Sequence, residues 1–222
     1  MEITQSDRER IEAAVKEAEG KTSGEIVPLV VERSGAYDSL RPRATLLGAM
    51  LGALVGLAGL SVQIPSADSF DTLQLSLELL LFAITPVLIG GALLGLLSTK
   101  SSALLRLLVP PSTVDDALKA RAQQAFLEHE IFNTRDRTGI LIMVSLDEHR
   151  VTVLADAGIN QKVDTSTWDE CVDLVLAGIK KGNFGEGMAD AVRRCGDIVT
   201  DAGFTIREDD TNELSDSLKV EV

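Results

Sequence analysis

Cysteine, histidine and aromatic residues are scarce in this sequence, and each shortage excludes a class of protein. The 222 residues contain 2 Cys and 2 His, and 4% of them are aromatic. Two cysteines cannot build a disulfide scaffold or a multi-cysteine metal module, and two histidines cannot form a histidine-rich metal site. Positive charge is also short, because 21 Lys and Arg face 34 Asp and Glu and leave a formal net charge of −13. Since binding to a nucleic-acid backbone needs clustered positive charge, no nucleic-acid partner is expected.

Apolar residues are plentiful, but charge is distributed very unevenly among them. Hydrophobic residues make up 45% of the chain and charged residues 25%, which is the composition of a folded protein rather than a disordered one. Residues 1–43 carry 7 basic and 9 acidic side chains and residues 100–222 carry 14 and 22, whereas residues 44–99 carry none and 3. No charged residue occurs from Ala44 to Ala67 or from Leu79 to Thr99.

These two uncharged segments are long enough to cross a bilayer. Each has at least about 20 residues, which at about 1.5 Å per helical residue spans a hydrocarbon core of about 30 Å. Core helices of soluble proteins rarely stay uncharged over such a length. We therefore predict a transmembrane helical hairpin within residues 44–99, with helices at about 44–64 and 79–99.

Glycine recurs at every fourth position in both predicted membrane helices. Gly48, Gly52 and Gly56 share one face of the first helix, and Gly91 and Gly95 share one face of the second. Small residues let two helix backbones approach closely within lipid, but glycine is also simply common in membrane helices. The spacing leaves both interpretations open.

Basic residues on either side of the hairpin predict its orientation. Arg33, Arg41 and Arg43 precede the first helix and Lys100 and Arg106 follow the second, while the connecting loop has only acidic charges. Because cytoplasmic flanks are enriched in Lys and Arg, we expect a two-pass protein of the inner (cytoplasmic) membrane with both termini in the cytoplasm.

The rest of the chain predicts one α/β domain that the hairpin interrupts. A capping-box pattern at Ser6 and Glu9 begins a helix that Gly20 ends, and the apolar run Glu25–Val31 follows as a strand. Pro28 cannot donate a hydrogen bond to a β-ladder, so this strand is expected at a sheet edge or at a bulge.

Further helices and strands are expected after the hairpin. They are a helix from Thr113 to near Phe132, strands Ile140–Ser145 and Val151–Ala155, a helix capped by Thr167 with Glu170, and a helix after the connection Gly182–Gly187. The two strands are separated by a short polar break and can pair only as an antiparallel hairpin. Residues 1–43 and 100–206 thus form the domain, and residues 207–222 form an acidic C-terminal tail.

Polar side chains are expected to collect at one edge of the sheet. The first two strands are joined through a helix and should be parallel, so their starts and the end of the third strand share one edge. The opposite edge should face the bilayer, together with the turn that contains His149. The side chains that can converge at the membrane-distal edge are Ser23, Glu25, Arg135, Asp136, Arg137, Asp156 and Asn160.

At these residues the sequence resembles the TPM-domain family. The resemblance is carried by Thr22–Val27, Asn133–Ile142, Glu148–Val151, Leu154–Ile159 and Asp209–Leu214, over nearly all of the chain outside the predicted membrane helices. The family includes a thylakoid-lumen acid phosphatase, a photosystem II repair protein and an accessory subunit of acetylcholine receptors. The resemblance implies an α/β/α sandwich on a small mixed sheet, interrupted here by the two-helix transmembrane hairpin. It does not decide between catalysis and binding, since one fold can carry unrelated functions.

The membrane-distal edge has a catalytic and a structural interpretation. Asp136 and Asp156 could act as a carboxylate pair, one as nucleophile or metal ligand and the other as acid/base, with arginine holding a phosphate. In the structural interpretation, which we favour, the same residues form ion pairs that fix the sheet edge. The sequence has no HExxH, phosphate-loop or GxSxG motif. We interpret His149 as an exposed residue of a hairpin turn, and its expected place near the bilayer leaves contact with lipid headgroups as the alternative.

Two other groups are weighed against ordinary structural roles. Asp209, Asp210 and Glu213 supply hard oxygen ligands that could hold Ca²⁺ or Mg²⁺, but an acidic tail is more often solvated. Cys171 and Cys195 lie far apart in the sequence and outside any CxxC pair, so we interpret them as helix residues rather than metal ligands or a redox couple.

Together these features predict an integral membrane protein whose cytoplasmic TPM domain binds or assists another membrane component, such as a membrane protein. The alternative is a membrane-bound, acid-phosphatase-like hydrolase that uses Asp136 and Asp156 at the membrane-distal sheet edge.

Overall fold

The computed structural model describes residues 3–63, 72–98, 101–206, 209 and 212–221. The chain divides into two compact units. One unit is built from Met1–Gly35 and Val114–Val222, and the other is Ala36–Thr113. The sequence of the first unit is therefore interrupted by the second.

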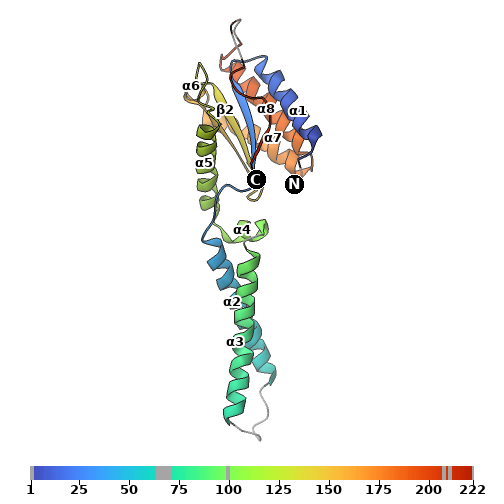
Figure 1. The fold of residues 1–222 in the computed structure, drawn as a ribbon, viewed down its shortest axis with the longest axis vertical. Coiled ribbons are helices and arrows are strands. Elements are labelled where there is room, and N and C mark those ends of the chain that lie inside the picture. Colours follow the sequence, from blue (N-terminus) through green and yellow to red (C-terminus); the bar gives the residue numbers. More distant parts are fainter. Residues whose placement is uncertain (1–2, 64–71, 99–100, 207–208, 210–211, 222) are drawn as a thin grey trace. The chain divides into compact units, whose positions relative to one another are not determined.

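Within its described residues, the first unit contains a four-stranded mixed sheet (Figure 1). Its strands are β1 (Glu25–Val31), β2 (Gly139–Ser145), β3 (Arg150–Ala155) and β4 (Lys219–Glu221), in the order β3-β2-β1-β4. β1 pairs in parallel with β2 and β4, and β2 pairs antiparallel with β3. The structure thus confirms the predicted parallel pair and the antiparallel hairpin.

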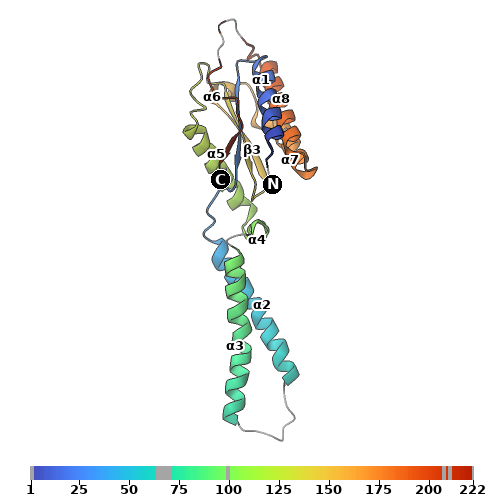
Figure 2. The ribbon, with the colours of Figure 1, turned by 45° about the vertical axis from the view of Figure 1, so that its right-hand side comes forward.

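Helices cover both faces of the sheet, and every residue of β1 and β2 is therefore buried. Alternate residues of a strand point to opposite faces. One face packs against α1 (Gln5–Glu19), α7 (Asp169–Lys180) and α8 (Phe184–Asp201), and the other packs against α5 (Pro111–Glu128). Figure 2 shows α1, α7 and α8 on one side of the sheet and α5 on the other. The unit is the expected α/β/α sandwich.

The first strand lies inside the sheet, and the expectation of an edge strand or bulge at Pro28 was wrong. β1 runs between β2 and β4. Proline is tolerated because β4 pairs only with Leu29–Val31, so that ladder begins one residue after Pro28. β4 belongs to the segment that sequence analysis treats as an acidic tail, and Leu218, just before it, is buried in the core.

α1 ends at Gly20 as predicted but begins at a different residue, and α5 differs from the prediction at both ends. α1 is capped by Thr4, which forms a capping box with Asp7, instead of by Ser6 with Glu9. α5 begins at Pro111 rather than Thr113, because proline suits the first position of a helix. α5 ends at Glu128, before the left-handed residue Glu130 (φ 52°), instead of near Phe132.

The connections around the last helices also differ from the prediction. A short 3-10 helix, η1 (Thr165–Trp168), precedes α7. α8 begins at Phe184, so the connection predicted over Gly182–Gly187 is shorter than expected. A four-residue helix, α6 (Ala157–Asn160), follows β3.

The second unit contains the two long apolar helices α2 (Leu40–Gln63) and α3 (Thr72–Leu97) and the short helix α4 (Ser102–Leu108). The segments 40–59 and 80–97 are long and apolar enough to cross a membrane. Many of their large side chains are exposed: Leu46, Leu54 and Leu88 are 64%, 63% and 67% exposed. Core helices of soluble proteins bury such side chains.

The glycines of the second unit lie where α2 and α3 touch. A Cβ atom added at Gly48 would lie 2.1 Å from the Gly90 carbonyl oxygen, and one added at Gly52 would lie 2.0 Å from the Pro86 carbonyl oxygen. No side chain fits at these distances, so the two backbones can approach each other only because glycine is present. Of the two interpretations of the glycine spacing, close helix packing is the one that the structure supports.

Candidate functional site

The three segments predicted to meet do lie at one edge of the sheet. β1 and β2 begin there, with Glu25 opposite Gly139, and β3 ends there, with Ala155 opposite Ile140. The loops are tied together beyond the strands, since the Thr138 hydroxyl donates to the Ser23 carbonyl oxygen at 2.7 Å. We call this the polar edge of the domain.

An ion pair between Asp156 and Arg137 forms the centre of the polar edge. Asp156 caps α6, and its carboxylate accepts the backbone N–H of Ala157 at 2.6 Å. The same carboxylate accepts two hydrogen bonds from the Arg137 guanidinium, from Nε at 2.6 Å and from Nη2 at 2.9 Å. The bidentate geometry fixes both the position and the orientation of the guanidinium.

The two partners of this ion pair differ sharply in exposure. The side chain of Asp156 is only 5% exposed, whereas that of Arg137 is 55% exposed. The hydrogen bonds and charge of Asp156 raise the pKa of Arg137 above its ordinary value, so the guanidinium stays charged. The buried carboxylate therefore holds an oriented positive charge at the surface.

The local backbone of the polar edge is shaped for this arrangement. Arg137 has a left-handed conformation (φ 57°), and its N–H donates to the Thr134 carbonyl oxygen at 3.2 Å. Gly158 is required beside it, because a Cβ atom there would lie 2.5 Å from the Asp136 carbonyl oxygen. The backbone of the 133–139 loop and the start of α6 therefore come close enough for Arg137 to reach Asp156.

The acidic tail residues gather around Arg135. Its guanidinium donates to the Asp209 carboxylate at 3.0 and 3.3 Å, and its backbone N–H donates to the Glu213 carboxylate at 3.1 and 3.2 Å. Asp210 lies outside the described residues. Of the two described members of the predicted metal cluster, Asp209 is thus paired with the Arg135 guanidinium and Glu213 accepts the Arg135 backbone N–H. Among the described residues, no group of three or more His, Cys, Asp or Glu is arranged to hold a metal ion. Because Asp210 is not described, the Ca²⁺ or Mg²⁺ site stays a prediction.

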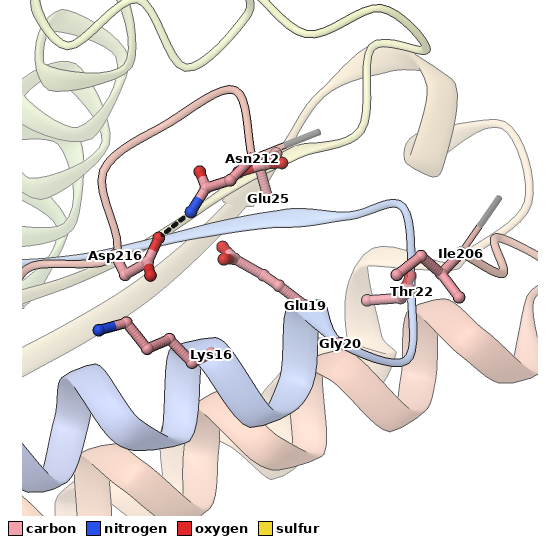
Figure 3. A pocket seen from close by; sticks show the side chains of 8 residues that line it. All are labelled: Lys16, Glu19, Gly20, Thr22, Glu25, Ile206, Asn212 and Asp216. Carbon is pink, nitrogen blue, oxygen red and sulfur yellow. Dashed lines mark hydrogen bonds between the residues drawn. The ribbon is translucent and has the colours of Figure 1, made fainter. Parts of the chain in front are cut away.

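A pocket of about 230 Å³ opens beside the polar edge, between α1 and the C-terminal segment (Figure 3). Lys16, Glu19, Glu25, Asn212 and Asp216 give it a mainly acidic lining. The Glu25 carboxylate accepts the backbone N–H groups of residues 213 and 214 at 3.2 and 3.3 Å, which fastens the C-terminal segment across the pocket.

Burial changes the protonation of the two glutamates in this pocket. Burial raises the pKa of Glu19 to about 8, and the nearby charges of Glu25 and Asp216 act in the same direction. A hydrogen bond from the Ile26 N–H, at 2.9 Å, opposes this rise in the pKa only in part. Burial also raises the pKa of Glu25. The pocket therefore carries less negative charge at neutral pH than its three carboxylates suggest.

The other predicted site residues have different positions. Asn160 uses its side-chain amide to donate to the Ala155 carbonyl oxygen at 2.6 Å, which closes the turn after β3. Asp136 is half-buried in the same loop as Arg137. His149 is exposed in the turn between β2 and β3, at the other end of these strands, and has a left-handed backbone (φ 53°). It is not part of the polar edge.

Sequence reasoning missed Glu19, Asn212 and Asp216. The latter two come from the segment interpreted as a solvated tail, so nothing in the sequence joined them to α1. Glu19 gave a weak signal, because an acidic residue in the last turn of a helix opposes the helix dipole and usually has a local reason.

Comparison with known proteins supports the expected fold. The sequence model of the TPM domain matches residues 92–198. A solved structure, the NMR structure of the BA42 protein from the psychrophilic bacterium Bizionia argentinensis, is similar with a TM-score of 0.55 and 18% sequence identity. That match covers 99% of this chain and 96% of the other chain, and at this identity it concerns the fold alone. No curated protein matches the chain by sequence.

Proposed function

Because this chain is a protein of the TPM-domain family, we propose that it is an integral membrane protein whose cytoplasmic TPM domain binds another component of the membrane. The exposed apolar surface of α2 and α3 supports the membrane part of this proposal, since soluble monomeric proteins rarely expose such large apolar patches to water. A bilayer covers such a surface without further protein contacts.

The orientation of the hairpin is part of the proposal, and it rests on the flanking arginines. Both termini lie in the cytoplasm in this arrangement. A reporter enzyme that works only outside the cytoplasm, fused after Val222, should stay inactive. An active fusion would place the C-terminus on the other side and contradict the cytoplasmic TPM domain.

The observation that favours binding is the fixed orientation of the Arg137 guanidinium. A guanidinium held by a buried carboxylate loses little conformational entropy when it meets an anionic group, so it is a prepared contact for a carboxylate or phosphate of a partner. The buried partner Asp156 is already saturated by Arg137 and the Ala157 N–H, which leaves it poorly suited to act as a nucleophile.

Crosslinking in native membranes, followed by mass spectrometry, tests this proposal. The wild-type protein should give reproducible crosslinks to a membrane component, and Arg137→Gln should reduce their yield at least several-fold. Arg150→Gln is the matched control, because Arg150 is a similarly exposed arginine paired with Asp115 at the other end of the strands. Equal yields from wild type and Arg137→Gln would show that the polar edge is not the contact.

A phosphomonoesterase is the second candidate, and the exposed Arg137 beside carboxylates is the observation that favours it. The purified full-length protein would then hydrolyse a generic phosphomonoester, and the Asp136→Asn, Asp156→Asn double variant would lose the turnover. If wild type and double variant show the same trace activity, the hydrolase is excluded and the binding role is unaffected.

A further inference from the structure

The helices α7 and α8 pack against each other unusually closely because glycine faces glycine. A Cβ atom added at Gly178 would lie 2.7 Å from the Gly187 Cα atom, and one added at Gly187 would lie 2.7 Å from the Gly178 Cα atom. The two helices are consecutive and joined by a short connection, so they run antiparallel. About two helical turns away from this contact, Cys171 on α7 and Cys195 on α8 come opposite each other.

The two thiols are in direct contact in the core. The Sγ atoms of Cys171 and Cys195 lie 3.0 Å apart, and both side chains are 0% exposed. A disulfide bond is about 2.05 Å long, so small side-chain movements of about 1 Å would bring the two sulfur atoms together. The sequence does not predict this contact, because the two cysteines are 24 positions apart and meet only through the antiparallel packing of α7 and α8.

We propose that Cys171 and Cys195 form a disulfide bond that joins α7 to α8 when the protein meets a disulfide oxidant such as oxidised glutathione. One cysteine thiolate attacks the glutathione disulfide and releases one glutathione thiolate. The second cysteine thiolate then attacks the mixed disulfide and releases the other. The two protein thiols lose two electrons and two protons, and one oxidised glutathione becomes two reduced glutathione molecules.

The environment of the pair makes this reaction slow in the closed protein. Burial raises the pKa of the Cys195 thiol well above its ordinary value, and the hydrogen bond with Cys171 adds to this effect. Because only the thiolate is the nucleophile and neither sulfur is exposed, exchange must pass through a local opening of α7 and α8. The two thiols are therefore protected from oxidation in the closed protein and become reactive when α7 and α8 open locally.

The experiment uses the full-length protein in detergent. Samples are incubated with oxidised glutathione at temperatures up to the thermal transition, quenched with acid, alkylated with N-ethylmaleimide and measured by intact mass spectrometry. The expected product has no alkylated thiol and is about 2 Da lighter than the reduced protein, since two hydrogens are lost. Its apparent melting temperature should exceed that of the reduced protein by about 5–10 °C, because the bond closes a loop in the unfolded chain.

Single-thiol variants provide the control. Cys171→Ser and Cys195→Ser should each keep one thiol that is alkylated or carries one glutathione, with no gain in melting temperature on oxidation. Two alkylated thiols in the wild-type protein at the transition temperature would overturn the proposal. So would glutathione adducts on both cysteines, a covalent dimer, or a bond that lowers the melting temperature, since each of these shows that the sulfurs do not meet in the native arrangement.

Discussion

At the scale of single residues, the carboxylates of the TPM domain differ because their surroundings differ. Asp156 is buried beside the guanidinium of Arg137, which compensates its charge. Glu19 is half-buried beside two other carboxyl groups, Glu25 and Asp216, which make its charge less favourable. The same chemical group thus lies beside a positive charge in one place and beside other carboxyl groups in the other, where its pKa is raised.

The Asp156–Arg137 pair should contribute more to stability than a surface ion pair. Asp156→Ala leaves the Arg137 guanidinium and the Ala157 N–H without their acceptor, so we expect a loss of about 2–3 kcal/mol in the free energy of unfolding. Asp115→Ala, which breaks the pair with Arg150 between side chains 60% and 45% exposed, should cost less than about 0.5 kcal/mol. Thermal unfolding of both variants measures the difference. Equal losses would show that burial of Asp156 has no energetic importance.

Glu19 should make the domain less stable as the pH rises. Its pKa is about 8 in the folded protein against an ordinary value of 4.5, so between these pH values the folded state binds a proton that the unfolded chain has lost. Stability therefore falls as the pH rises from about 4.5 to about 8. Glu19→Gln keeps an acceptor for the Ile26 N–H and removes the titrating group.

Melting temperatures measured from pH 5 to pH 8.5 test this pH dependence. The Glu19→Gln variant should show a flatter pH dependence than wild type and a gain on the order of 1–3 kcal/mol at pH 8. Glu12→Gln changes a partly exposed residue of the same helix that does not line the pocket, and it should follow the wild-type curve apart from a small offset. A Glu19→Gln variant with the full wild-type slope would show that Glu19 is charged in the folded protein.

At the scale of secondary-structure elements, close approach of backbones through glycine occurs twice in this molecule. Gly48 and Gly52 of α2 contact the backbone of α3 in the apolar unit, and Gly178 and Gly187 join α7 to α8 in the TPM domain. In both places glycine lets two helix backbones approach more closely than a larger residue would allow.

The glycine contact between α2 and α3 should not tolerate a larger side chain. Gly52→Leu would drive a Cβ atom into the Pro86 carbonyl oxygen, so the two helices must separate or shift. We expect a lower melting temperature for α2 and α3 in detergent, followed by circular dichroism. Ala58→Leu places the same side chain at an exposed position of the same helix and should leave the transition within about 2 °C. A Gly52→Leu variant as stable as this control would contradict the close packing.

At the scale of the whole molecule, the two compact units have separate interiors. The buried clusters on both faces of the sheet consist only of residues from the first unit, although its sequence is interrupted by the second. Long insertions in a loop cost little entropy once the ends of the loop are close. The TPM domain therefore does not need the apolar helices for its core.

Replacing Ala36–Thr113 by a flexible glycine and serine linker should give a water-soluble, folded domain. The full-length protein should stay with the membrane fraction after alkaline washing and be released by detergent, whereas the shortened protein should be found in the supernatant with a cooperative thermal transition. Full-length protein in the supernatant without detergent would contradict membrane insertion. A shortened protein without a cooperative transition would show that the first unit needs the second.

Patterns with a local physical cause were predicted well from the sequence. β1 has the predicted bounds because its apolar run is flanked by polar residues, and a helix follows the hairpin as predicted, with Leu118 and Phe126 of α5 buried on one face. Helix starts were predicted less well, because Thr4 and Ser6 both offer a capping side chain with an acidic residue three positions later, and the structure uses Thr4 with Asp7. The prediction of an edge strand at Pro28 was wrong because β4, a three-residue strand near the end of the chain, pairs with β1 only from Leu29 onward.

The sequence by itself determined the long uncharged segments, the α/β pattern and the polar residues that end at one edge of the sheet, because periodicity and charge act over a few neighbouring residues. Only the tertiary structure decided that the acidic tail returns as β4, that Glu19 faces Glu25 and Asp216, and that Cys171 touches Cys195. These contacts join residues far apart in the chain, and their energies depend on burial, which no local pattern records.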